Sequence, residues 1–150
     1  MIFATVGTTQ FDELVVAIDK IAPELNEEVV IQMGYYNRYI PHNCKYFTFT
    51  DNVLKYYKEA TVIIAHGGAG VTFEVLNLGK KLISVENPHA LDGHQGDLLS
   101  KLSQDGYLIW CKNLDHIKNH IERARNINIK KYIKPECNIG KMIDRFLLRN

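Results

Sequence analysis

Hydrophobic and polar positions follow two different periods along the chain. Short runs rich in apolar residues predict strands: the run 62–65 is apolar throughout, as in a strand covered on both faces, and 46–49 alternates. Longer stretches with an apolar residue every three or four positions predict amphipathic helices. The predicted strands are 2–6, 29–33, 46–49, 62–65, 82–85 and 108–111. The predicted helices are 9–22, 52–60, 69–78, 93–104 and 114–125.

Strands that alternate with helices in this way are typical of an open α/β sheet, Rossmann-like and mostly parallel, with helices on its faces. The 150 residues have the length of one domain, so we expect residues 1–150 to form a single unit. Thr9 and Asp12 have the spacing of a capping box and predict the start of the first helix.

A last amphipathic helix is expected over about 139–148. Its apolar stripe would consist of Ile139, Met142, Ile143, Phe146 and Leu147. Docking of this stripe on the core is the simpler interpretation, and a lid or a contact with a partner is the alternative.

The most distinctive segment is the turn after the fourth predicted strand. Gly67, Gly68, Ala69 and Gly70 lead directly from that strand into a helix. A helix N-terminus carries unpaired N–H groups and the positive end of the dipole, and the glycines leave room for another group to approach. Such a site favours an anion, usually a phosphate. A tight connection that serves only the fold is the alternative.

Common phosphate and hydrolase motifs are absent. No GxxxxGK[ST] string occurs, which excludes a Walker A loop. The dinucleotide pattern GxGxxG fails because Phe73 occupies the place of the third glycine. The chain also lacks the GxSxG elbow of an α/β-hydrolase.

Three features of the same predicted sheet edge indicate a nucleotide sugar. Glu74 lies four residues after Gly70, where its carboxylate could accept hydrogen bonds from the vicinal hydroxyls of a ribose; a solvated acid stabilised by the helix dipole is the alternative. The polar loop 87–95 follows the next strand and is rich in groups that bind sugar hydroxyls. The first strand ends in the small, hydroxylated turn 6–9.

Composition and charge are compatible with a globular protein that binds a nucleotide sugar. Hydrophobic residues make up 46% of the chain and the formal net charge is +1, as expected of a globular protein. Residues 112–150 hold 10 Lys/Arg and 4 Asp/Glu, a local charge of +6. A solvated helical face explains this charge as well as attraction to an anionic membrane surface or an acidic partner does. Nucleic acid is disfavoured because no aromatic-rich basic motif accompanies the charge.

Compartment signals are consistent with a cytoplasmic protein. No apolar run approaches the ~20 residues of a membrane span. The apolar N-terminus lacks a basic region before it, so we interpret it as the first strand and not as a signal peptide. The three cysteines are widely spaced, with no CxxC pair, and indicate reduced thiols; they are Cys44, Cys111 and Cys137.

Residues 61–80, with their HGGAG and Glu74, together with 82–85 and 92–95, resemble the C-terminal domain of glycosyltransferase family 28. The resemblance covers nearly the whole chain from the turn 6–9 onward. It is strongest to a short, single-domain branch, which includes the catalytic subunit of the eukaryotic two-subunit transferase that passes GlcNAc from UDP to dolichol-linked GlcNAc. That branch also includes small subunits of bacterial exopolysaccharide and capsule glycosyltransferases.

The resemblance implies the donor-binding half of a GT-B enzyme that inverts the anomeric configuration, with a UDP-sugar as donor substrate and no cofactor or metal. Backbone amides of 67–70 would hold the diphosphate and Glu74 the ribose. The phosphate-side turn would be Gly7, Thr8 and Thr9, and the uracil would lie along Phe49, Thr50 and Asp51. His94 and Gln95, with Asp92 in the same loop, would contact the transferred sugar. The catalytic candidates are His66, His94 and Gln95, with the general base unassigned.

A complete GT-B enzyme has two such domains, so the resemblance implies a membrane-associated subunit that binds a lipid-linked sugar acceptor. The chain would then be peripheral at the membrane through that partner, with little transfer activity alone; a homo-oligomer in isolation stays open. A non-catalytic accessory subunit that enhances a partner transferase is the alternative function. A nucleotide-binding module without a transferase role is another.

Two smaller clusters have ordinary explanations beside functional ones. His116 and His120 share a helix face and could pair on a metal, but a surface pair is the simpler interpretation. The loop 34–42 carries Tyr35, Tyr36 and Tyr39 beside Arg38, which favours loop packing over contact with an acceptor or partner.

Overall fold

The computed structural model describes residues 1–90, 94–136, 138–139, 143 and 146. Its strands are β1 (Ile2–Thr5), β2 (Val29–Gln32), β3 (Lys45–Phe47), β4 (Val62–His66), β5 (Leu82–Val85) and β6 (Ile109–Cys111). Its helices are α1 (Asp12–Ile21), α2 (Val53–Glu59), α3 (Ala69–Asn77), α4 (Gln95–Gln104) and α5 (Ile117–Asn126). Short 3₁₀ turns at Ala22–Glu24 and Leu114–His116 follow α1 and precede α5.

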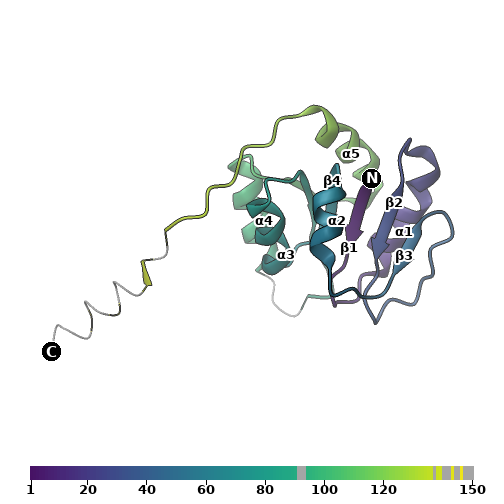
Figure 1. Cartoon of the computed structure of the whole chain (residues 1–150), viewed down its shortest axis with the longest axis horizontal. Coiled ribbons are helices and arrows are strands. Elements are labelled where there is room, and N and C mark those ends of the chain that lie inside the picture. Colours follow the sequence, from purple (N-terminus) through teal and green to yellow (C-terminus); the bar gives the residue numbers. More distant parts are fainter. Residues whose placement is uncertain (91–93, 137, 140–142, 144–145, 147–150) are drawn as a thin grey trace.

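The six strands form one sheet in the order β3-β2-β1-β4-β5-β6. The strands β1 to β4 are labelled in Figure 1. Every neighbouring pair is parallel, so the predicted Rossmann-like sheet is confirmed. Parallel strands joined by crossover helices are covered on both faces, which explains why β1, β2 and β5 are buried at every position.

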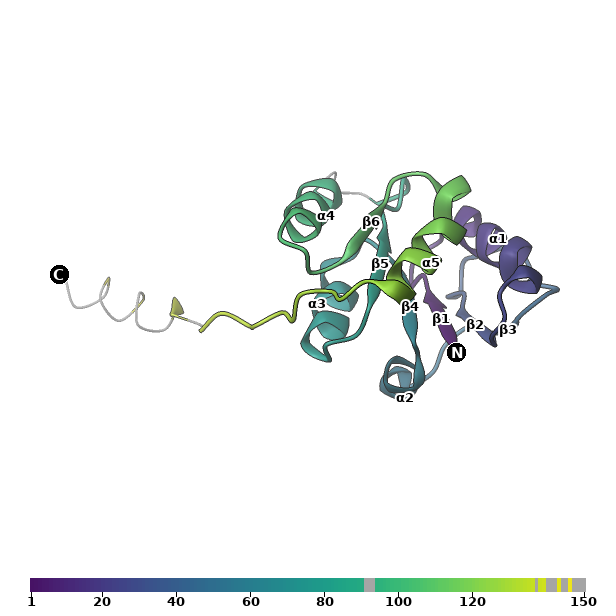
Figure 2. The ribbon, with the colours of Figure 1, turned by 90° about the horizontal axis from the view of Figure 1, so that it is seen from above.

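The sheet separates two hydrophobic layers. Alternate residues of β1 point to opposite faces: Ile2 and Ala4 pack with α1 and α5, whereas Phe3 packs with α2, α3 and α4. Figure 2 shows the same division, with α1 and α5 on one side of the sheet and α2 and α3 on the other. Because all the strands are parallel, their carboxyl ends lie at one common edge of the sheet.

The predicted capping box at the start of α1 is wrong. The helix begins at Asp12, its N-cap is Phe11, and no side chain caps it. Thr9 lies outside the helix, where its hydroxyl donates to the Val6 carbonyl at 2.8 Å. The Asp12 carboxylate accepts instead from the backbone N–H groups of Arg38 and Tyr39, at 2.8 and 3.0 Å, in the loop after β2.

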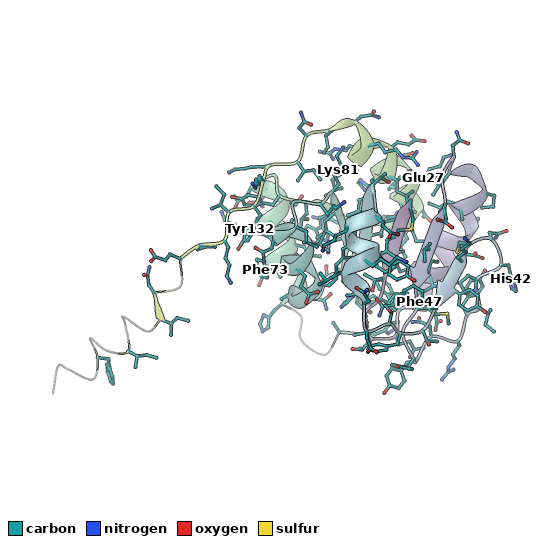
Figure 3. All side chains as sticks on the ribbon, viewed as in Figure 1. Glu27, His42, Phe47, Phe73, Lys81 and Tyr132 are labelled. Atoms are coloured by element: carbon teal, nitrogen blue, oxygen red, sulfur yellow. The ribbon has the colours of Figure 1, made fainter. Side chains whose placement is uncertain are left out.

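The segment after α5 crosses the layer of α3 and α4 before it leaves the domain (Figure 1). Tyr132 packs on Phe73 of α3 and on Tyr107, with ring centroids 5.7 and 5.3 Å apart (Figure 3). Of the predicted last helix 139–148, the described residues Ile139, Ile143 and Phe146 are helical and exposed, and the remaining positions lie outside the described residues. Within the described part of the chain, no helix has the length and apolar character that a membrane span requires.

Candidate functional site

The strand order creates a crevice at the carboxyl ends of β1 and β4. These strands are neighbours, yet β1 continues into α1 on one face of the sheet and β4 continues into α3 on the other. The two connections therefore separate as they leave the sheet. In open α/β sheets ligands bind at this point, where the order of the strands reverses.

The glycine turn after β4 forms one wall of the crevice. A Cβ atom on Gly67 would lie 2.7 Å from the Gln95 side-chain oxygen, and one on Gly68 would lie 2.5 Å from Nε2 of His66. The His66 ring therefore requires Gly68, whereas at Gly67 the close contact is with the flexible end of the Gln95 side chain. Gly70 differs, because a Cβ atom there would meet no atom of the described residues within 4 Å.

The helix that follows starts without a side-chain cap. Gly68 is the N-cap of α3, and no side-chain cap hydrogen bond is made there among the described residues. Ala69 and Gly70 are exposed at that turn. The predicted anion site thus has an exposed helix N-terminus at the crevice, with small residues around it.

His66 fills the space between the two turns of the crevice. Gly7 has φ +61°, and a Cβ atom on it would lie 2.7 Å from Cε1 of the His66 ring, while Gly68 closes on the same ring from the β4 side. Burial lowers the pKa of His66, and a backbone interaction with Thr5 only partly opposes this effect. The sequence shows that His66 precedes the glycine turn. It does not predict that the His66 ring packs between Gly7 and Gly68.

The lowered pKa of His66 predicts a pH-dependent stability. Below its ordinary pKa of 6.5 the unfolded chain binds a proton that the folded chain does not, so stability should decrease as the pH falls below about 6.5. We expect urea denaturation between pH 5 and pH 8 to show this slope, and His66→Gln to reduce it. Part of the slope should remain, because burial also lowers the pKa of His120. An unchanged slope in the variant would contradict this prediction.

Asn87 joins the loop after β5 to the turn after β1. Its Nδ2 donates to the Thr9 hydroxyl at 3.2 Å and to the Gln10 carbonyl at 3.1 Å, and its backbone N–H donates to Oε1 of Gln95 at 3.0 Å. The side chain is 4% exposed. Asn87 belongs to the predicted polar loop 87–95, but its hydrogen bonds to the turn after β1 were not predicted.

Two cavities adjoin at Gly68 and Gln95. One, of about 230 Å³, is lined by Gly67, Gly68, Ala69, His94, Gln95 and Leu98. The other, of about 490 Å³, is lined by Thr9, Gln10, His66, Gly68, Asn87, His89, Ala90 and Gln95. The structure therefore brings together most of the residues predicted for the diphosphate and the sugar. Asp92 lies outside the described residues.

The turn after β1 forms the wall opposite the glycine turn. The Gly7 N–H donates to the Thr5 hydroxyl at 3.0 Å, and that hydroxyl donates to Oε1 of Gln32 on β2 at 2.9 Å. Thr8 and Thr9 are exposed at the crevice side of this turn. The predicted phosphate-side turn is thus held by buried polar groups of β1 and β2.

The residues predicted for the nucleoside lie toward α2. Phe49, Thr50 and Asp51 form the turn between β3 and α2, in which the Thr50 hydroxyl accepts from the Asn52 N–H at 3.2 Å. Glu74 is exposed on α3. Burial raises the pKa of Tyr57 in α2, and the charge of Glu74 adds to this effect. The residues predicted for the base and the ribose thus lie on the β3–α2 turn and on α3.

Asp19 holds the tyrosine-rich loop 34–42 onto α1. Its fully buried carboxylate accepts from the Tyr39 hydroxyl at 2.7 Å and from the backbone N–H groups of His42 and Asn43 at 3.0 and 2.7 Å. Burial alone would raise the pKa of Asp19, but these hydrogen bonds and that of the Cys44 thiol lower it to about 2. The predicted loop packing is thus present for Tyr39, whereas Tyr35 and Tyr36 are exposed.

The other candidates do not join the crevice. Among the described residues, no cluster of three or more His, Cys, Asp or Glu side chains could hold a metal, so His116 and His120 have no third ligand there. Cys44 and Cys111 are free thiols, and Cys137 lies outside the described residues.

Fold and site together define a Rossmann-like domain of the kind found in GT-B glycosyltransferases. Residues 1–124 match the glycosyltransferase family 28 C-terminal domain, and the chain belongs to this family.

Several relatives carry transferase names. The chain is 32% identical over 126 residues to the human "UDP-N-acetylglucosamine transferase subunit ALG13". The matched region covers 73% of this chain and 11% of the human protein. It is 31% identical over 119 residues to the "UDP-N-acetylglucosamine--N-acetylmuramyl-(pentapeptide) pyrophosphoryl-undecaprenol N-acetylglucosamine transferase" of Rickettsia akari, covering 70% of this chain and 30% of that protein. The chain thus spans about a tenth to a third of these relatives.

Solved structures show the same fold. The solution structure of ALG13 superposes with a TM-score of 0.62 at 18% identity, covering 97% of this chain and 94% of that one. The MurG structure from Acinetobacter baumannii superposes with a TM-score of 0.63 at 19% identity, covering 99% of this chain and 49% of that one. The chain therefore corresponds to about half of the MurG structure.

Proposed function

We propose that this chain is the donor-binding catalytic component of an inverting two-component glycosyltransferase. It would bind a UDP-sugar and pass the sugar to a lipid-linked acceptor held by a membrane-associated partner. The observation that carries this proposal is the uncapped N-terminus of α3 at the reversal of strand order, with Gly70 open to an approaching group. The names of the human and Rickettsia relatives support a UDP-GlcNAc donor as the first one to test.

The crevice provides the chemistry that departure of UDP requires. As the bond to the sugar breaks, negative charge grows on the β-phosphate while the sugar becomes oxocarbenium-like. Backbone N–H groups at the start of α3 are already oriented toward that charge, so they need no reorganisation; such preorganised donors contribute several kcal/mol in comparable oxyanion sites. His94 and Gln95 line the smaller cavity, where the transferred sugar would lie.

The remaining catalytic task is removal of the proton from the acceptor hydroxyl. The low pKa of His66 keeps its imidazole neutral near pH 7, as a base requires, but its ring is enclosed between Gly7 and Gly68. His94 is exposed at the rim. We therefore leave the general base open between these histidines and the partner.

The comparison with the MurG structure supports a half-enzyme character, because the chain covers 49% of that structure. An acceptor-binding half would then come from another chain or a further domain. We propose that such a partner supplies it and places the chain at the cytoplasmic membrane surface. A non-catalytic accessory role predicts donor binding without transfer in the assembled complex.

Calorimetric titration with UDP, UDP-GlcNAc, UDP-Gal, UDP-Glc and UDP-GlcA tests the donor site directly. Binding of UDP and at least one UDP-sugar is expected. If no uridine nucleotide binds, the proposal is wrong. Transfer measured after co-expression with the membrane-associated partner then separates the catalytic from the accessory role.

Glu74 provides a sharper test of the ribose position. If its carboxylate accepts from the ribose hydroxyls, Glu74→Ala should weaken UDP binding about tenfold, in line with charge-assisted hydrogen bonds of about 1.5–3 kcal/mol. The variant should also lose the preference for UDP over 2′-deoxy-UDP. Glu122→Ala, an exposed acid on α5, is the matched control. Equal UDP affinity of Glu74→Ala and the wild type would refute the ribose assignment.

A further inference from the structure

Two exposed aromatic rings stack at the edge of the sheet where the nucleoside would bind. Tyr35, in the loop after β2, and Phe49, after β3, have ring centroids 5.8 Å apart and an interplanar angle of 23°. The side chains are 61% and 46% exposed. A stacked pair that leaves this much aromatic surface in water is a suitable platform for another planar ring.

The loop that carries Tyr35 is held rigidly. The Asn37 side chain accepts from the Phe11 N–H at 2.9 Å and donates to the Met33 carbonyl. Asp12 and Asp19 bind the backbone further along the loop. A fixed backbone that presents an exposed ring loses little conformational entropy when a ligand binds.

The same loop lies against the phosphate side of the crevice. Gly34 has φ +68°, and a Cβ atom on it would lie 3.0 Å from the carbonyl oxygens of both Gly7 and Thr9. Its N–H donates to the Thr48 carbonyl at 3.1 Å, next to Phe49. Tyr35 is therefore one residue from a backbone that touches both the turn after β1 and the end of β3.

We infer that Tyr35 is a base-positioning residue, whose ring extends the surface of Phe49 against which the uracil of the donor stacks. This inference rests on the proposed function. With the diphosphate at the start of α3 and the ribose at Glu74, the base would extend toward the β3–α2 turn. In the sheet, β3 is two strands from β1. The hydrogen bonds proposed for the ribose and the phosphates do not involve Tyr35. Stacking of the base would give its exposed ring a role.

The test compares adjacent tyrosines. Tyr35→Ala should weaken binding of both UDP and UMP about tenfold, the effect expected for loss of one base–aromatic stack, and leave pyrophosphate binding unchanged. Tyr35→Phe should bind like the wild type. Tyr36→Ala is the matched control, because Tyr36 is 68% exposed in the same loop. Wild-type affinity of Tyr35→Ala for UMP would overturn the inference, while binding of UDP by the wild type would leave the proposed function standing.

A measurement on the unaltered chain gives an independent result. A uracil ring stacked on these residues should show upfield shifts of its H5 and H6 protons when UMP binds, because the aromatic ring currents shield them. The shift should decrease in Tyr35→Ala and persist in Tyr36→Ala. Binding of UMP without any upfield shift would overturn the inference, and failure of every uridine nucleotide to bind would overturn the proposed function with it.

Discussion

Replacing Asp19 by Asn should lower the free energy of unfolding by about 3 kcal/mol. The carboxylate is fully buried and accepts from hydroxyl, backbone and thiol donors together. An amide of the same shape supplies one oxygen and turns its NH₂ group toward those donors. The chain should therefore lose part of this network and leave buried donors unpaired. Urea denaturation at pH 7 measures the change.

The pH dependence distinguishes the carboxylate from a packing effect. Because the pKa of Asp19 is lowered to about 2, its charge stabilises the fold above its ordinary pKa of 3.8, and this stabilisation is lost as the pH falls toward 2. The difference between wild type and Asp19→Asn should therefore be largest near pH 7 and decrease below about pH 4.

Asp12→Asn is the matched control for the same loop. Asp12 is half-buried and accepts from the backbone of Arg38 and Tyr39, so we expect a smaller loss of roughly 1 kcal/mol. Equal stability of Asp19→Asn and wild type at pH 7 would contradict the assigned role of Asp19.

The fold followed from local patterns. Runs such as 29–31 and 62–65 are apolar throughout because parallel strands are covered on both faces, so the place of these strands could be predicted. The helix starts were less predictable. Thr9 is a residue type that often caps helices, but the turn after β1 continues past it and the N-cap is Phe11. The Phe11 N–H donates to the Asn37 side chain in the β2–β3 loop, a contact between distant parts of the chain.

The site could be predicted only where residues are close in sequence. The glycine turn and Glu74 share one strand–helix unit, so their neighbourhood is visible in the chain. Asn87 is different, because its partners Thr9 and Gln10 lie 78 and 77 positions away. Only the parallel sheet brings them together. The same holds for Tyr35 and Phe49, whose contact depends on the pairing of β2 with β3.

Gly70→Asp should separate ligand binding from folding more sharply than any other change in the crevice. The new side chain meets no protein atom within 4 Å of its Cβ, so the fold should accept it. An acid in the first turn of a helix is also favourable by about 0.3–1 kcal/mol. We therefore expect unchanged or slightly higher stability.

UDP binding by the same variant should fall by about 100-fold or more. A carboxylate roughly 4 Å from a phosphate, at an effective dielectric constant of about 20, is disfavoured by about 4 kcal/mol, and each 1.4 kcal/mol is about tenfold in affinity. Because the repulsion is electrostatic, the loss should become smaller as ionic strength rises. Calorimetry with UDP at low and high salt measures both effects.

Asn77→Asp places the same charge at the other end of α3 and is the matched control. It should bind UDP like the wild type, because the carboxylate then lies about 10 Å along the helix from Gly70. If Gly70→Asp is folded and also binds UDP like the wild type, the diphosphate does not lie at the start of α3. The common edge of β1 and β4 would then need another explanation for its open glycine.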